Sequence, residues 1–402
     1  MTVMTPRRAA AVTLVVAFCL VAANMRSAIT AVGPVLDRIG ADTGLSVAAL
    51  GMITSVPLLV WAAASPFAHG LSRRFGLSHT LLGALGLLAA GVIIRSLPGS
   101  SVWLWLGTLL IGASLALGNV LMPAVVKRDF PGRVPLMMGV YSALLGAFGA
   151  LASGVAVPLA RLPLGDGEAG WRFALLVTGG ALLPFAIVLW WRVIRRETAD
   201  TAVASAASRA RRAIWADPVA WVVAVYMGLQ ASSFYIFVTW IPAISTSIGR
   251  SEELSGIDVA VYQLCSLAGS LSLPFLLRGR AERVIPAALP LLGLVGVAGL
   301  FAAPQGILAW IAAIGLFSGA SLSMCLTLMA QRARDQDGAT ALSGMSQSVG
   351  YLITAVGPVA FGALHALSGD WIGPLVLSGA IMLGQALVGV FAGRDRYVFE
   401  RR

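Results

Sequence analysis

Long apolar segments separated by short polar breaks run the whole length of the chain. Each segment is long enough to cross the hydrocarbon core of a bilayer, which takes about 20 apolar residues in a helix. The segments that we predict to be membrane-spanning helices are 10–37, 45–68, 79–97, 102–126, 134–160, 171–193, 218–247, 255–277, 284–303, 306–330, 339–366 and 371–392. The pattern therefore predicts an all-α membrane protein of twelve helices, with both ends of the chain on the same side.

Composition and charge agree with a membrane protein. Of the 402 residues, 58% are hydrophobic and only 11% are charged, whereas soluble domains carry about 25% charged residues. Most of the 28 Lys and Arg residues fall in connections on one side of the predicted membrane. The other side holds only Arg38, Arg95, Arg161, Arg172 and Arg250. The positive-inside rule then places both termini on the cytoplasmic side of the membrane. Because topology explains the net charge of +11, nucleic acid is not an expected partner.

The two halves of the chain resemble each other. The sequence Thr30–Val35 recurs as Thr354–Val359, and the helices that hold them lie in different halves. We predict a six-helix bundle at 1–193, a cytoplasmic linker at 194–216 and a second six-helix bundle at 217–402. Two bundles related by an axis along the membrane normal would give such a parallel repeat, as in the major facilitator fold.

Arg26 is the most informative single residue, because it lies within the first apolar segment. A charge at the bilayer centre costs a few kcal/mol even on lenient scales. The acidic residues, 17 in all, lie at or beyond the ends of the predicted helices, and Asp258 is the deepest of them. We therefore expect Arg26 to face a hydrated cavity between the bundles, where its planar donor fork would attract an anion. The alternative is a structural ion pair with another helix.

Other polar side chains inside the apolar segments must also face a neighbouring helix or a cavity. The residues that we expect to orient a substrate by hydrogen bonds are Asn24, Tyr141, Gln230, Tyr235, Gln347 and Tyr351. Those expected at a gate or in the cavity wall are Asn119, Phe234, Trp240 and Gln263. For any single polar residue of these groups, an ordinary hydrogen bond between helices is an equally good interpretation, and aromatic residues such as Phe234 and Trp240 more often serve plain packing.

Motifs of catalysis or metal binding are absent from the sequence. It contains no HExxH, P-loop or GxSxG pattern and no cluster of carboxylates, so we expect neither an enzyme nor a metal or cofactor. Cys19, Cys265 and Cys325 stand in apolar stretches without a CxxC pair and are interpreted as core residues. No acidic or histidine relay is visible inside a helix, which leaves the coupling ion open.

Four motifs resemble one family within the major facilitator superfamily, the cyanate permease and 2-nitroimidazole transporter family. They are Asn24-Met25-Arg26 with Val32-Gly33-Pro34, Gly118–Pro123 with Lys127–Pro131, Gln230 with Phe234-Tyr235 and Trp240-Ile241-Pro242, and Ser346–Tyr351 with Gly357-Pro358. The motifs span both halves of the chain. The resemblance implies a carrier of small compounds, among them cyanate and nitroimidazoles, in the bacterial inner membrane.

The sequence thus predicts a secondary transporter, expected to be a monomer, that moves a small anion or small polar compound by alternating access. Two alternatives stay open at this stage. One is a multidrug exporter of amphipathic compounds, whose apolar cavity would tolerate loss of Arg26. The other is a membrane receptor that uses the same scaffold without transporting anything. The substrate, the direction of transport and the coupling ion are not fixed by the sequence.

Overall fold

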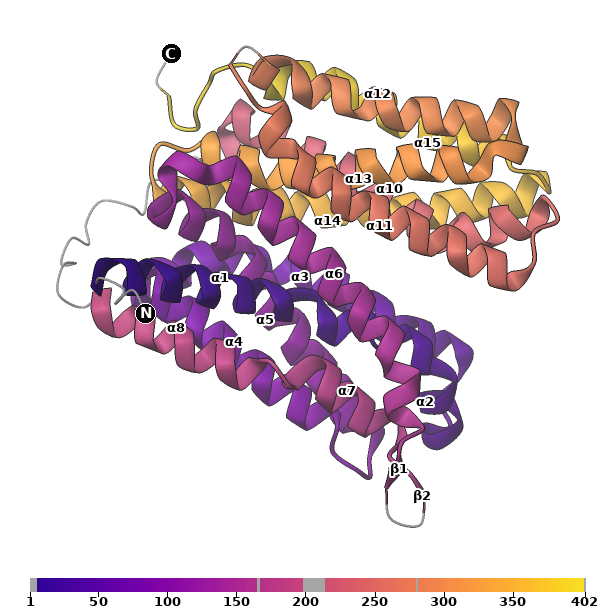
Figure 1. Cartoon of the computed structure of the whole chain (residues 1–402), viewed down its shortest axis with the longest axis horizontal. Coiled ribbons are helices and arrows are strands. Elements are labelled where there is room, and N and C mark those ends of the chain that lie inside the picture. Colours follow the sequence, from indigo (N-terminus) through magenta and orange to yellow (C-terminus); the bar gives the residue numbers. More distant parts are fainter. Residues whose placement is uncertain (1–5, 165–166, 198–213, 280, 401–402) are drawn as a thin grey trace, which may run out of the picture. The chain divides into compact units, whose positions relative to one another are not determined.

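The computed structural model describes residues 6–164, 167–197, 214–279 and 281–400, which are almost all helical (Figure 1). The helices of the first half are α1 (Pro6–Thr30), α2 (Leu36–Thr43), α3 (Val47–Phe75), α4 (Leu77–Arg95), α5 (Ser101–Asp129), α6 (Val134–Ala160), α7 (Gly170–Gly180) and α8 (Leu183–Glu197). Those of the second half are α10 (Pro218–Ser247), α11 (Glu252–Leu276), α12 (Ala281–Ala302), α13 (Ile307–Gln331), α14 (Gln336–Ser368) and α15 (Ile372–Ala392). Two short strands, β1 (Pro163–Leu164) and β2 (Gly167–Glu168), form an antiparallel hairpin between α6 and α7.

Eleven helical stretches among the described residues are long and apolar enough to cross a membrane. They coincide with eleven of the predicted segments, with ends that differ by a few residues. The remaining predicted segment, 45–68, is covered by α3, which has 29 residues. The prediction of an all-α membrane protein is confirmed.

The first helix is shorter than predicted, because α1 ends at Thr30 although the apolar segment continues to residue 37. Pro34 has no backbone N–H and cannot donate to the carbonyl of Thr30. Two residues earlier, the Val32 N–H donates to the Ile29 carbonyl, three residues back, at 3.2 Å. The carbonyl of Ala28 consequently loses the donor that a continuous helix would supply.

The sixth predicted helix is also interrupted, which corrects the expectation of one helix over 171–193. It forms two pieces, α7 and α8, which are labelled separately in Figure 1. Pro184 cannot donate to the carbonyl of Gly180, the residue at which α7 ends. The Ala181 N–H still bonds to the Val177 carbonyl at 3.0 Å. The chain therefore turns for two residues before the helix resumes.

The chain forms two compact units. Unit 1 consists of Met1–Met122 and Leu144–Ala206, and unit 2 consists of Pro123–Ala143 and Ala207–Arg402. The start of α6 thus belongs to unit 2, where the hydroxyl oxygens of Ser142 and Ser270 are 2.9 Å apart. The predicted bundle boundaries stay a prediction, since most of the expected linker at 194–216 lies outside the described residues.

Glycine residues allow α11 and α13 of unit 2 to lie with their backbones in contact. A Cβ atom built on Gly319 would lie 1.7 Å from the carbonyl oxygen of Ser266, and one built on Gly269 would lie 2.1 Å from that of Leu316. No other residue type fits either position without moving a helix. This close crossing holds α11, which supplies a site residue, at a fixed distance from α13.

Candidate functional site

Arg26 lies one turn before the end of α1, within the membrane-spanning stretch Ala11–Val35. It is the one charged residue in the sequence of that stretch. Its side chain is half-buried. A Cβ atom built on Gly149 of α6 would lie 3.4 Å from Arg26 Cδ, so the methylene stem of the arginine rests against the α6 backbone. Glycine at position 149 leaves the room for that stem.

Two hydroxyl groups attach the Arg26 segment to α6 inside unit 1. Ser27 Oγ donates to the carbonyl of Phe148 at 3.3 Å, and Thr30 Oγ1 donates to the carbonyl of Gly149 at 2.8 Å. Both residues follow Arg26, in the last turn of the same helix. An arginine whose helix is held next to it is positioned before a ligand arrives, which is the usual requirement of a specific binding group.

In unit 2, Ser318 of α13 is a meeting point of three helices. Gln230 of α10 is 2% exposed and donates from Nε2 to the Ser318 carbonyl at 3.2 Å. The hydroxyl of Tyr262 on α11 donates to Ser318 Oγ at 2.9 Å. Because a carbonyl only accepts, the bond between Gln230 and the Ser318 carbonyl requires the NH₂ end of the Gln230 amide to point at α13.

The other end of the same amide, Gln230 Oε1, is buried and has no hydrogen-bond partner among the described residues. Leaving a buried acceptor unsatisfied costs about 1–3 kcal/mol. An N–H or O–H group of a ligand would relieve that cost. Gln230 is therefore prepared to accept a hydrogen bond from a substrate, as is Gln347, whose Oε1 is likewise buried without a partner among the described residues.

Aromatic rings lie beside this meeting point. The ring of Phe234 packs edge-on against Tyr235, with centroids 5.2 Å apart, and lies 6.1 Å from the ring of Tyr262. Both Phe234 and Tyr235 are half-buried. The structure thus brings two predicted residues into one cluster one turn beyond Gln230 on α10.

Gln347 and Tyr351 share one face of α14. Gln347 is 1% exposed and donates from Nε2 to Ser343 Oγ at 3.1 Å, whereas Tyr351 is half-buried. A Cβ atom built on Gly350 would lie 3.2 Å from the sulfur of Met227 on α10. This level of α14 therefore packs against α10 within one turn of Gln230.

The two predicted asparagines make local hydrogen bonds. Asn24 Nδ2 donates to the Leu20 carbonyl at 2.7 Å, and Asn119 Nδ2 donates to the Leu115 carbonyl at 2.8 Å. Each bond lies within the asparagine's own helix, and both side chains are at most 8% exposed. One amide end of each residue is consequently engaged by its own backbone.

The remaining predicted residues lie in different parts of unit 2. Tyr141 is fully buried in the first turns of α6, and Gln263 is half-buried on α11. Trp240 packs against Phe361 and Trp371 with centroids 5.7 and 6.2 Å apart. It belongs to an aromatic cluster with the end of α14, separate from the Gln230 bonds.

Sequence reasoning missed Tyr262 and Ser318. Tyr262 precedes the predicted Gln263 by one residue. The hydroxyl group that bonds to Ser318 from α11 belongs to Tyr262. A small residue such as Ser318 gives no signal in an apolar helix, because its role depends on the helices that cross there.

Arg95, which the sequence pattern places on the outer side of the membrane, is the last residue of α4 and is 1% exposed. Its Nη1 donates to the Ala28 carbonyl at 2.7 Å. A Cβ atom on Gly107 would lie 2.5 Å from Arg95 Cβ. The glycine in α5 therefore allows the end of α4 to pack directly against the α5 backbone.

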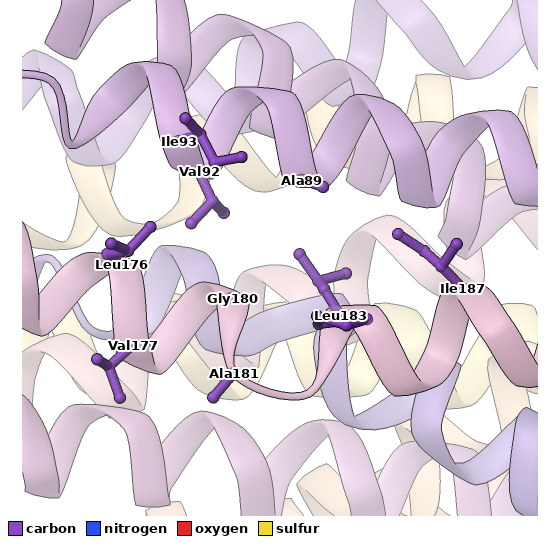
Figure 2. A pocket seen from close by; sticks show the side chains of 10 residues that line it. Ala89, Val92, Ile93, Leu176, Val177, Gly180, Ala181, Leu183 and Ile187 are labelled. Carbon is purple, nitrogen blue, oxygen red and sulfur yellow. The ribbon is translucent and has the colours of Figure 1, made fainter.

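A pocket of about 340 Å³ lies between α4 and the α7–α8 break. Figure 2 shows Val92 and Ile93 of α4 near Leu176 of α7 at one end of the pocket, and Leu183 and Ile187 of α8 toward the other end. Its lining residues are all apolar and offer no side chain that would bind an anion. Among the described residues, no group of three His, Cys, Asp or Glu side chains is placed to hold a metal ion.

Comparisons with known proteins show which proteins this chain is similar to. The family model described as Major Facilitator Superfamily matches residues 14–358. The 2-nitroimidazole transporter of Escherichia coli (strain K12) is 37% identical over 388 residues, which cover 96% of this chain and 97% of that protein. The cyanate transport protein CynX of the same organism is 27% identical over 88% of this chain and 90% of its own length. Among solved structures, the proton:xylose symporter XylE has a TM-score of 0.73 at 13% identity, covering 95% of this chain and 94% of that one.

Proposed function

The chain belongs to the major facilitator superfamily and is a multi-pass membrane transporter, and on that premise we propose that it carries a small anionic or small polar solute. The solute would cross the bacterial inner membrane by alternating access, in a protein that works as a monomer with both termini in the cytoplasm. The asymmetric distribution of Lys and Arg supports this orientation.

The observation that carries the proposal is the placement of Arg26. It is a guanidinium within a membrane span, half-buried, with its stem fitted against Gly149 and its helix tied to α6. A charge retained at such depth marks a substrate or ion pathway more often than it serves packing. Arg26 would bind the negative or electron-rich end of the solute through its planar fork.

A second contact is assigned to Gln230, whose Oε1 would accept a hydrogen bond from an N–H or O–H group of the solute. Further orienting hydrogen bonds are assigned to Asn24, Tyr141, Tyr235, Gln347 and Tyr351. Small-ligand sites use few polar groups of this kind in an otherwise apolar wall.

The compounds in the names of the relatives fit the donors of Arg26 and the acceptor of Gln230. Cyanate is an anion, and 2-nitroimidazole carries a nitro group, whose oxygens accept hydrogen bonds, together with a ring N–H. Arg26 supplies donors that suit both compounds, and Gln230 Oε1 supplies the acceptor that the ring N–H needs. We therefore propose a solute of this class, in preference to a bulky amphipathic drug or a ligand that is sensed without being transported.

Uptake into proteoliposomes that contain the purified protein tests the proposal. The variants are Arg26→Gln, which removes the charge, and Arg26→Lys, which keeps the charge but loses the fork. Arg38→Gln is the matched control, because Arg38 is paired with Glu168 at the molecular surface and exposed pairs contribute little to stability. Thermal unfolding of each variant shows whether the fold is retained.

We expect Arg26→Gln to abolish cyanate or 2-nitroimidazole transport, Arg26→Lys to retain a small part of it, and Arg38→Gln to behave like the unmodified protein. Transport of lipophilic cations that survives in Arg26→Gln would instead support a multidrug exporter. Saturable binding of a solute without any counter-transport would support a receptor.

A further inference from the structure

A second pocket, of about 110 Å³, lies in unit 2 where three helices end. It is formed by the first turns of α10, the residue after α13 and the chain that leaves α15. Its lining residues are Pro218, Val219, Val222, Val223, Arg332, Phe391, Ala392, Arg394 and Arg396. One wall is thus apolar and the other carries three guanidinium groups.

Arg332 forms the buried part of the basic wall. It is 9% exposed, and its Nε and Nη2 donate to the carbonyls of Ala392 and Gly393 at 3.2 and 3.3 Å. Its contact with Asp395 is longer, at 3.5 Å, and that carboxylate is 61% exposed. These backbone bonds hold the guanidinium in place without neutralising it.

Arg394 and Arg396 are exposed at the pocket, and the guanidinium of Arg394 lies 4.6 Å from the ring centroid of Phe391. The nearest capping acid, Asp217, already accepts hydrogen bonds from the N–H groups of Val219 and Phe399. Three guanidinium groups thus line the pocket, and Asp217 and Asp395 are the carboxylates that lie beside it.

The first turn of α10 reaches the pocket through Pro218 and Val219. The N-terminal end of a helix favours anions, but Pro218 has no N–H and the Val219 N–H is already capped by Asp217. The three arginines therefore supply the groups that would bind one phosphate-sized anion.

Tryptophan residues mark the depth of the pocket in the membrane. Trp215 and Trp221 flank the start of α10, are 40% and 43% exposed, and pack edge-on with centroids 6.4 Å apart. Exposed tryptophans at the ends of spanning helices lie at the level of the lipid headgroups. Phe391, on the apolar wall, is 53% exposed at the end of the spanning helix α15.

We propose that this pocket binds the phosphate of an anionic phospholipid of the phosphatidylglycerol class. The three arginines hold the phosphate, while the acyl chains lie along Val222 and Phe391 on the outer surface of unit 2. An exposed apolar wall next to the basic wall favours a lipid over a soluble anion, because only a lipid satisfies both. Phosphatidylethanolamine is disfavoured, since its ammonium group would lie against the guanidiniums.

Native mass spectrometry of the full-length protein, released from mixed micelles with equal amounts of dioleoyl phosphatidylglycerol and dioleoyl phosphatidylethanolamine, tests the site. We expect the unmodified protein to retain phosphatidylglycerol in preference. A basic group near a membrane surface contributes about fivefold to the binding of anionic lipid, so Arg394→Gln with Arg396→Gln should weaken retention by more than tenfold.

Arg278→Gln is the matched control. Arg278 is exposed and lies 5.7 Å from the ring centroid of Phe275 near the end of α11, which reproduces the Arg394–Phe391 contact outside the pocket. Equal loss of lipid in the control and the double variant would overturn the proposal, as would equal retention of the two lipids. Thermal stabilisation by inorganic phosphate alone that matches the effect of phosphatidylglycerol would replace the lipid with a soluble anion. None of these results depends on transport.

Discussion

Arg95 Nη1 donates a 2.7 Å hydrogen bond to the carbonyl oxygen of Ala28, which joins the end of α4 to the last turn of α1. This carbonyl is the one that loses its helical donor where α1 ends before Pro34. A buried arginine thus completes the hydrogen bonding of an interrupted helix. It also fixes the end of the helix that carries Arg26, two residues from Ala28.

Arg95→Met should therefore lower both thermal stability and transport. The variant leaves the Ala28 carbonyl buried without a donor, at a cost of about 1–3 kcal/mol. Differential scanning fluorimetry in detergent measures the stability. Arg172→Gln, which removes an exposed partner of Asp42, is the control and should change it little. A melting temperature that is the same in Arg95→Met and in the unmodified protein would show that the bond has no structural role.

Gly319→Ala should be among the most harmful small substitutions in the chain. The new Cβ would lie 1.7 Å from the Ser266 carbonyl oxygen, so α11 and α13 would have to separate. Overpacking of this kind costs about 1–3 kcal/mol and occasionally more. Gly154→Ala in α6 is the control, since nothing lies within 4 Å of its Cβ. Thermal unfolding should separate the two variants, and similar melting temperatures would contradict the close crossing.

Asp258 and Arg250 form a buried ion pair in unit 2. Arg250 Nε and Nη2 each donate to the carboxylate, at 2.9 and 2.8 Å, and Asp258 is fully buried. Asp258→Ala would leave a cation beside a buried, empty position, and breaking one side of such a pair costs about 3–5 kcal/mol. Thermal unfolding should show this loss. Replacing both residues, as Asp258→Leu with Arg250→Met, should recover part of it; no recovery would mean that the carboxylate stabilises something else.

The positions of the spanning helices were predictable from the sequence, because a membrane demands about 20 apolar residues wherever a helix crosses it. The point at which a helix breaks inside an apolar segment was not predictable. The repeated segment is the clearest case, since Pro34 ends α1 whereas Pro358 lies within the continuous helix α14. The local sequence is the same, and the packing of the neighbouring helices decides the outcome.

The candidate site was predictable in part for a related reason. Arg26 and Gln230 are conspicuous because polar groups are rare in apolar helices. The burial of Arg95 was not predictable, because a basic residue at a helix end has the same sequence signal whether it is exposed or buried. Ser318 carries no signal of its own, and its importance arises only where α10, α11 and α13 meet.

The acceptor assigned to Gln230 predicts how the transporter treats the N–H group of its substrate. If Gln230 Oε1 receives the ring N–H of 2-nitroimidazole, the N-methyl analogue should be transported more weakly by the unmodified protein, because a buried acceptor left without its donor costs about 1–3 kcal/mol. Competition for uptake in proteoliposomes measures the difference between the two compounds.

In Gln230→Met the two compounds should compete equally, because the acceptor is absent for both. Gln263→Met is a second variant of the same type on α11, and if Gln230 is the acceptor, it should keep the preference for the N–H compound. A preference that persists in Gln230→Met and disappears in Gln263→Met would move the contact to the neighbouring helix. In that case Gln230 would serve only to hold α10 against Ser318.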